Sequence, residues 1–126
     1  MPPQWKQLAA LAESEVEATL RNLPTKLRDQ ARALPVTYEP FPNDDLVDDG
    51  IEPDTLGLFV GGEFSEAGHV PIPAQIILFL ENIWLMIEEE GGGEKEFRHE
   101  VRTTLLHELG HYLGLDEGDL EARGLE

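Results

Sequence analysis

The chain has 126 residues, enough for one domain with a hydrophobic core but too few for two. Hydrophobic residues make up 40% and charged residues 28%, as in a soluble globular protein, and 26 acidic against 9 basic side chains give a formal net charge of −17. Nucleic acids and anionic membranes attract clustered Lys and Arg, so this charge argues against both as partners.

Cysteine is absent, which excludes a disulfide framework and a thiolate metal site. The first residues lack the basic segment and the continuous apolar run of a secretory signal. The most apolar stretch, 76–87, is interrupted by Glu81 and Asn82 and is too short to span a bilayer as a helix. We therefore expect a cytoplasmic protein without a membrane span, folded as a single domain over residues 1–126.

The first part of the chain predicts two helices and a strand. A first amphipathic helix follows Pro2 and Pro3, and its apolar positions recur at helical spacing. These positions are Trp5, Leu8, Ala12, Val16, Leu20 and Leu23. Pro24 ends this helix, and Thr25 is the expected N-cap of a second short helix that runs through Leu34. The alternating residues 36–39 precede Pro40 and predict a short strand.

The acidic segment 43–54 invites comparison with a calcium-binding loop, because Asp48, Asp49 and Gly50 fall together. If Gly50 is the sixth position of an EF-hand loop, Val47 is the third and Leu56 the twelfth. Both of those positions require oxygen ligands, which valine and leucine lack. We therefore expect a solvated loop here and not an EF-hand.

The remaining segments predict a sheet and two helices. Residues 56–60 and 72–80 are apolar, rich in β-formers and separated by glycines, so they predict two neighbouring strands. Helical spacing returns in 82–90 and ends at the triple glycine 91–93, which is expected to be a flexible break. Residues 94–113 then predict a long helix whose core-facing stripe consists of Phe97, Val101, Leu105, Leu109 and Leu113. Together these elements predict an α+β domain with N-terminal helices, a small mixed sheet and a C-terminal helix.

The most informative motif lies at the end of this last helix and reads HExxHxxGxxE. His107 and His111 are four residues apart, so both imidazoles project from one helix face and can reach the same metal ion. Glu108 lies on a neighbouring part of that face, close enough to take a proton from a metal-bound water. The motif therefore indicates a hydrolytic zinc site.

Catalytic zinc usually has three protein ligands and an open fourth position, so a third ligand is required. Gly114 can end the helix, and a chain that turns there can bring Glu117 back toward the metal, with Asp116 as its nearest competitor. The other histidines are His69, expected in a loop, and His99. Because His99 precedes His107 by eight residues, or ~12 Å along the helix, we expect it to be a surface or packing residue.

These segments resemble the small bacterial zincin-like metallopeptidases, sometimes called minimal zincins. The resemblance is strongest in HExxHxxGxxE, extends to the leucine-rich helix before it, and is looser in residues 56–59 and 73–79. It implies a zincin-like α+β fold and metallopeptidase activity. In that family an aspartate is common at the position that Glu117 occupies here.

We therefore expect a zinc metallopeptidase that hydrolyses a peptide or protein substrate. His107, His111 and Glu117 are the predicted ligands of Zn²⁺, and Glu108 is the predicted general base acting on a zinc-activated water. Two alternatives remain: a metal-binding interaction module of zincin fold with little turnover, and a zinc hydrolase of a non-peptide bond. Glu108 favours a catalyst over a binding module, because a purely structural metal site does not require a base.

Overall fold

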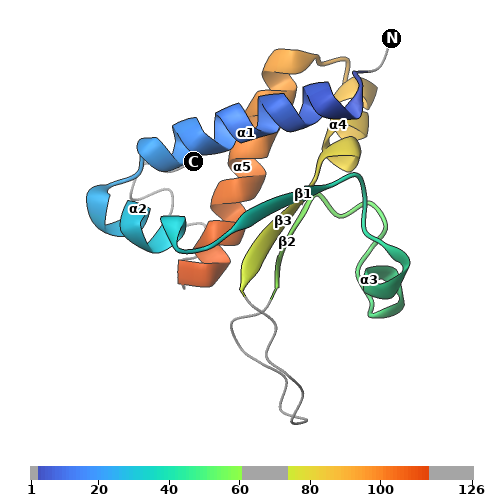
Figure 1. Cartoon of the computed structure of the whole chain (residues 1–126). Helices are drawn as coiled ribbons and strands as arrows, with labels where there is room; N and C mark the ends of the chain where they lie inside the picture. Colours follow the sequence, from blue (N-terminus) through green and yellow to red (C-terminus); the bar gives the residue numbers. More distant parts are fainter. Residues whose placement is uncertain (1–2, 61–73, 114–126) are drawn as a thin grey trace.

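The computed structural model describes residues 3–60 and 74–113. The helices and strands of this part are α1 (Trp5–Arg21), α2 (Thr25–Arg32), β1 (Val36–Glu39), α3 (Asp44–Asp48), β2 (Gly57–Val60), β3 (Gln75–Phe79), α4 (Leu80–Glu89) and α5 (Glu94–Leu113). In Figure 1, α1 crosses α5, and the three strands lie beside α5. The predicted α+β architecture, with N-terminal helices and a long C-terminal helix, is confirmed.

The three strands form one mixed sheet in the order β1-β3-β2. The central strand β3 pairs parallel with β1 and antiparallel with β2, with Val36 opposite Ile76 and Gly57 opposite Leu78. Ile76 and Leu78 are completely buried, as expected for a strand with neighbours on both sides. Strands β1 and β2 therefore form the two edges of the sheet, and β2 is the edge that packs against α5.

Helix α5 joins the sheet to the other helices, since it packs against α1, α4, β2 and β3. Four members of its predicted stripe, Phe97, Val101, Leu105 and Leu109, are buried in the hydrophobic core. They meet apolar residues of α1 and α4, which are Leu8, Ala12, Val16, Leu20, Ile83 and Ile87. Because this stripe occupies one side of α5, the side that carries the two histidines of the motif is left at the surface.

The acidic segment 43–54 differs from its prediction as a loop, because Asp44–Asp48 form the short helix α3. The Asn43 side chain caps it by accepting a hydrogen bond from the Leu46 amide at 2.9 Å. Two aspartates in its first turn interact favourably with the helix dipole. At the other end, Gly50 has a φ of +102° and its amide bonds the Val47 carbonyl, which ends the helix in a Schellman motif.

Two element boundaries and the conformation of the triple glycine also differ from the prediction. Thr25 is the first helical residue of α2 and not its N-cap, which is Pro24. Strand β3 ends at Phe79, because Leu80 already begins α4. The triple glycine is an ordered turn between two helices: Gly91 has a φ of +79°, and the Gly93 amide donates to Glu96 Oε1 at 2.8 Å. The first glycine thus ends α4 and the third helps to begin α5.

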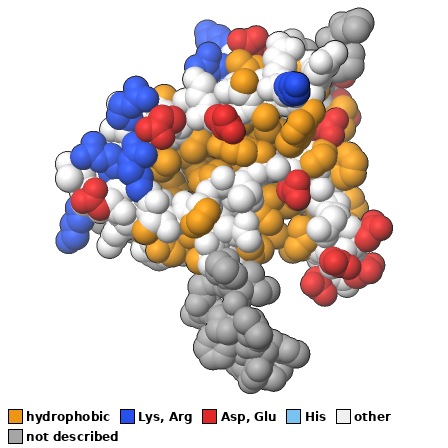
Figure 2. All heavy atoms as spheres, viewed as in Figure 1, with side chains coloured by type: hydrophobic (Ala, Val, Ile, Leu, Met, Phe, Trp, Pro, Cys, Tyr) orange, Lys and Arg blue, Asp and Glu red, His pale blue; other side chains and the backbone are white. Residues whose placement is uncertain are grey.

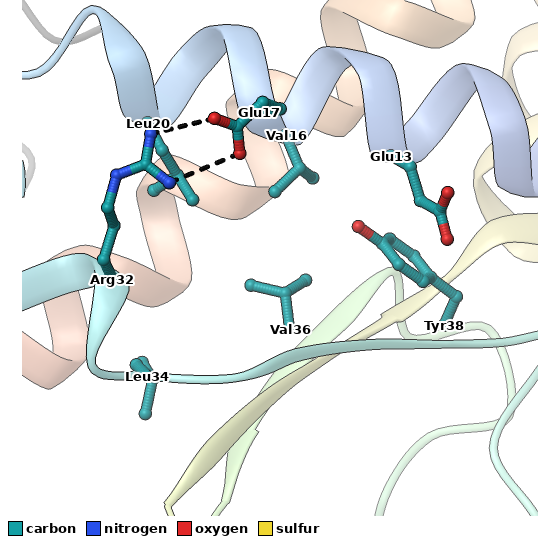
Figure 3. A pocket seen from close by; sticks show the side chains of 8 residues that line it. All are labelled: Glu13, Val16, Glu17, Leu20, Arg32, Leu34, Val36 and Tyr38. Atoms are coloured by element: carbon teal, nitrogen blue, oxygen red, sulfur yellow. Dashed lines mark hydrogen bonds and ion pairs between the residues drawn. The ribbon is translucent and has the colours of Figure 1, made fainter.

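A hollow of about 460 Å³ lies between α1, α2 and β1, at the edge of the sheet opposite β2 (Figure 3). Figure 2 shows hydrophobic surface between α1 and the sheet in this view. An ion pair of 2.9 Å between Arg32 and Glu17 closes one end, but both side chains are about half exposed, so it contributes little to stability. At the other end lies Tyr38, half buried below Glu13. Burial, and secondarily the Glu13 carboxylate, raises the pKa of Tyr38 to about 12.

This raised pKa predicts a pH-dependent loss of stability that Tyr38→Phe removes. The Tyr38 phenol ionises near pH 10 in the unfolded chain but near 12 in the folded protein. The preference of the fold for the neutral phenol is therefore fully present below pH 10 and is lost as the pH rises through about 12. Urea unfolding of both proteins between pH 9 and 12 measures the effect. If the free energy of unfolding falls equally with rising pH in the wild type and in Tyr38→Phe, the prediction is contradicted.

Candidate metal centre

Three potential metal ligands, His107, Glu108 and His111, come together near the end of α5. One donor atom from each side chain lies within 4.8 Å of the other two. The two imidazole rings have centroids 4.6 Å apart and an interplanar angle of 66°. Both histidines are exposed, whereas Glu108 is only 8% exposed. The motif thus brings the three side chains together, with the two imidazoles at the surface and the carboxylate buried beside them.

The different exposure of these residues follows from helix geometry. His107 and His111 are one turn apart in one row, and Glu108 is rotated by about 100° from His107, toward β2. Glu108 still lies close to the second histidine, because its Oε1 is 3.5 Å from His111 Nδ1. The two imidazoles thus face solvent, while the carboxylate lies at the bottom of the site, against the sheet.

Strand β2 can approach the Glu108 side chain closely because Gly57 has no side chain. A Cβ atom at Gly57 would lie 2.5 Å from Thr104 Cγ2 and 3.5 Å from Glu108 Cγ. Farther along the strand, the Phe59 ring packs edge-on against the Tyr112 ring with centroids 5.5 Å apart. The close approach at Gly57 and this ring contact hold the edge strand alongside the helix that carries both histidines. Figure 1 shows the strands beside α5.

Gly57→Ala is therefore expected to lower the free energy of unfolding by ~1–3 kcal/mol, the usual effect of overpacking. The clash partner is the methyl of a β-branched, buried threonine, which cannot rotate away easily. Thr104→Ser removes this methyl and keeps the hydroxyl, so the double variant should recover most of the loss. Urea unfolding of the two single variants and the double variant tests the coupling. Strictly additive effects would show that the predicted contact does not exist.

A pocket of about 270 Å³ opens between β2 and α5, next to the potential metal ligands. It is lined by Leu56, Gly57, Glu100, Thr103, Thr104, His107 and Glu108. A ligand in this pocket would therefore contact one of the two histidines and the buried carboxylate at the same time.

The other residues singled out in the sequence have different positions. His99 is exposed on α5, as predicted, and lines a separate hollow with Glu15, Arg98 and Arg102. His69, Gly114, Asp116 and Glu117 lie outside the described residues. The assignment of Glu117 as the third ligand therefore stays a prediction.

Sequence reasoning missed Gly57, Thr104 and Glu100, which surround the buried carboxylate and the pocket. One signal was available, because a glycine inside an apolar strand often marks a close approach of another backbone or helix. Glu100 and Thr104 lie eight and four residues before Glu108, respectively, which places them in the same helical row. Nothing in the sequence showed which strand would pack against that row.

Comparison with known families supports the resemblance found in the motif. A family model described as zincin-like metallopeptidase matches residues 31–125, which include the strands, α5 and the complete HExxHxxGxxE motif. No curated protein matches the chain. Among the described residues, no helix is both long and apolar enough to cross a membrane. Because the family match covers most of the sequence and the His-Glu-His group is in place, the chain belongs to the zincin-like metallopeptidase family.

Proposed function

We propose that the protein is a zinc-dependent peptidase in which Glu108 is the general base. The observation that carries this proposal is the position of Glu108, buried between the exposed histidines and a pocket large enough for part of a substrate. A metal site that only stabilises a fold has its coordination positions filled by protein and needs no such base. A carboxylate beside two imidazoles at the wall of an open pocket is suited to hydrolysis.

The donor set fits zinc, because imidazole nitrogens and carboxylate oxygens are its ordinary ligands in catalytic sites. We assign His107 and His111 as two ligands and Glu117 as the third, with Asp116 as the alternative. Bound zinc would supply a lowered pKa for a coordinated water and polarisation of the scissile carbonyl. The family match supports this choice of metal.

Glu108 would accept a proton from the attacking water and later donate it to the leaving amine. Its position suits this role, because the side chain is only 8% exposed and its Cγ lies next to Gly57 of β2. Its Oε1 lies 3.5 Å from His111 Nδ1, so the carboxylate is close to one of the two imidazoles that would hold the metal. General-base catalysis requires such a fixed carboxylate within hydrogen-bond reach of the reacting water.

The edge strand β2 supports a peptide as substrate over other hydrolysable compounds. Within the described part of the chain, β2 has β3 as its single partner strand. An extended peptide can add to such an edge through main-chain hydrogen bonds. A peptide bound there would run past the buried carboxylate, since Gly57 of β2 lies next to Glu108.

The test is hydrolysis of a broad library of unstructured peptides by the zinc-loaded protein. We expect cleavage that a chelator abolishes and that stoichiometric zinc restores. Cleavage that persists after complete removal of the metal would contradict the proposal. No zinc-dependent cleavage of any peptide would favour a binding module of zincin fold.

A further inference from the structure

The pocket beside the metal ligands has room for one side chain of a substrate. Its volume of about 270 Å³ is below the ~300–1,000 Å³ of sites that enclose a whole small-molecule ligand. It begins at His107 and Glu108 and continues along α5 toward Glu100. If the scissile bond of a substrate lies beside Glu108, the side chain of an adjacent substrate residue can therefore extend through the pocket toward Glu100.

Glu100 is the acidic group at the far end of this pocket. It precedes His107 by seven residues, so it lies on the same face of α5 and ~10.5 Å away along the helix axis. The Thr104 hydroxyl donates a hydrogen bond of 3.1 Å to Glu100 Oε2, which orients the carboxylate. Among the described residues, no cation forms an ion pair with Glu100.

The basic residues of α5 do not neutralise this pocket. Arg98 pairs with Glu15 of α1 at 3.3 Å, and both Arg98 and Arg102 line hollows on another side of the helix. The described residues that line the pocket include two glutamates and no lysine or arginine. Its remaining walls, which include Leu56 and Thr103, can contact the aliphatic stem of a long side chain.

On the basis of the proposed peptidase function, we infer that this pocket selects substrates with arginine or lysine next to the scissile bond, and that Glu100 is the residue that recognises the cationic group. A long stem is required to reach from the reacting bond to Glu100, and both residues have one. The oriented carboxylate can then accept charge-assisted hydrogen bonds from the cation. The net charge of −17 also favours the approach of basic peptides over acidic ones.

The selectivity is tested with a cleaved peptide in which the two residues flanking the scissile bond are replaced, one at a time, by arginine, norleucine or glutamate. For one of the two positions we expect kcat/KM to be about tenfold higher with arginine than with norleucine, and lowest with glutamate. Glu100→Gln should remove most of this preference. Glu94→Gln is the matched control, because it removes the same charge from the same helix outside the pocket and should leave the preference intact.

A binding measurement separates this inference from the proposed function. Fluorescence anisotropy is recorded with the same labelled peptides on zinc-loaded Glu108→Gln, with and without Glu100→Gln. Tighter binding of the arginine peptide that depends on Glu100 supports the pocket even if the wild type cleaves no peptide. Equal cleavage and equal binding of all three peptides would overturn the inference while leaving peptidase activity in place. A preference for arginine that Glu100→Gln does not change would also overturn it.

Discussion

The variants His107→Ala and His111→Ala should each abolish stoichiometric zinc binding, whereas the wild type binds about one zinc per chain. Both imidazoles belong to one group of donors within 4.8 Å, so removal of either leaves too few ligands for a stable site. We expect the affinity to fall by more than ~100-fold, since even the loss of a hydrogen bond to a ligand costs ~10–100-fold. Elemental analysis after dialysis, and titration against a competing chelator, measure this loss.

His99→Ala is the matched control, because His99 is another exposed histidine of α5 but lies outside the donor group. Its zinc content should equal that of the wild type. The same titration identifies the third ligand: Glu117→Ala should weaken binding more than Asp116→Ala. The reverse order would assign the third position to Asp116. Equal zinc content in the wild type and in both His107→Ala and His111→Ala would exclude the site altogether.

The helices that surround the site could be predicted because their apolar periodicity is strong. Helix α5 has the predicted bounds 94–113, since Phe97, Val101, Leu105 and Leu109 recur every four residues and must face a core together. The same spacing rule placed His107 and His111 on another side of the helix. Local sequence thus determined both the burial of one side and the accessibility of the other.

The contacts that complete the site depend on tertiary packing, which local patterns do not encode. Gly57 meets Thr104 although the two residues are 47 positions apart in the chain. The parallel pairing of β1 with β3, which leaves β2 at the edge next to α5, is likewise a property of the assembled sheet. The pocket that includes Glu100 exists only because this edge strand lies beside α5.

The short helix α3 shows a different reason for a wrong prediction. Its acidic composition suggested a solvated loop, but the cap at Asn43 and the left-handed Gly50 define both helix ends. These are local signals, and their spacing of seven residues encloses just over one turn of helix. In this segment the capping residues, and not the acidic composition, determine the backbone conformation.

Glu108→Gln should lower the rate of peptide hydrolysis by ~10²–10⁴-fold, the range attributed to general acid–base catalysis. The amide has nearly the shape of the carboxylate, so the packing of this buried side chain next to Gly57 should persist. His107, His111 and Glu117 are unchanged, and zinc content should remain close to that of the wild type. The variant therefore separates the loss of a base from the loss of metal or fold.

The decisive measurement combines kcat/KM, zinc content and thermal unfolding on the same preparations of wild type, Glu108→Gln and Glu94→Gln. Glu94→Gln should retain activity, because Glu94 lies at the start of α5 and ~21 Å from Glu108 along the helix axis. Unchanged hydrolysis by zinc-replete Glu108→Gln would assign the activity to a contaminating protease or to another base. Loss of zinc together with activity would instead make Glu108 a metal ligand, which its position within the donor group allows. Full zinc content with activity reduced at least 100-fold is the outcome expected of a residue that moves the proton and does not hold the metal.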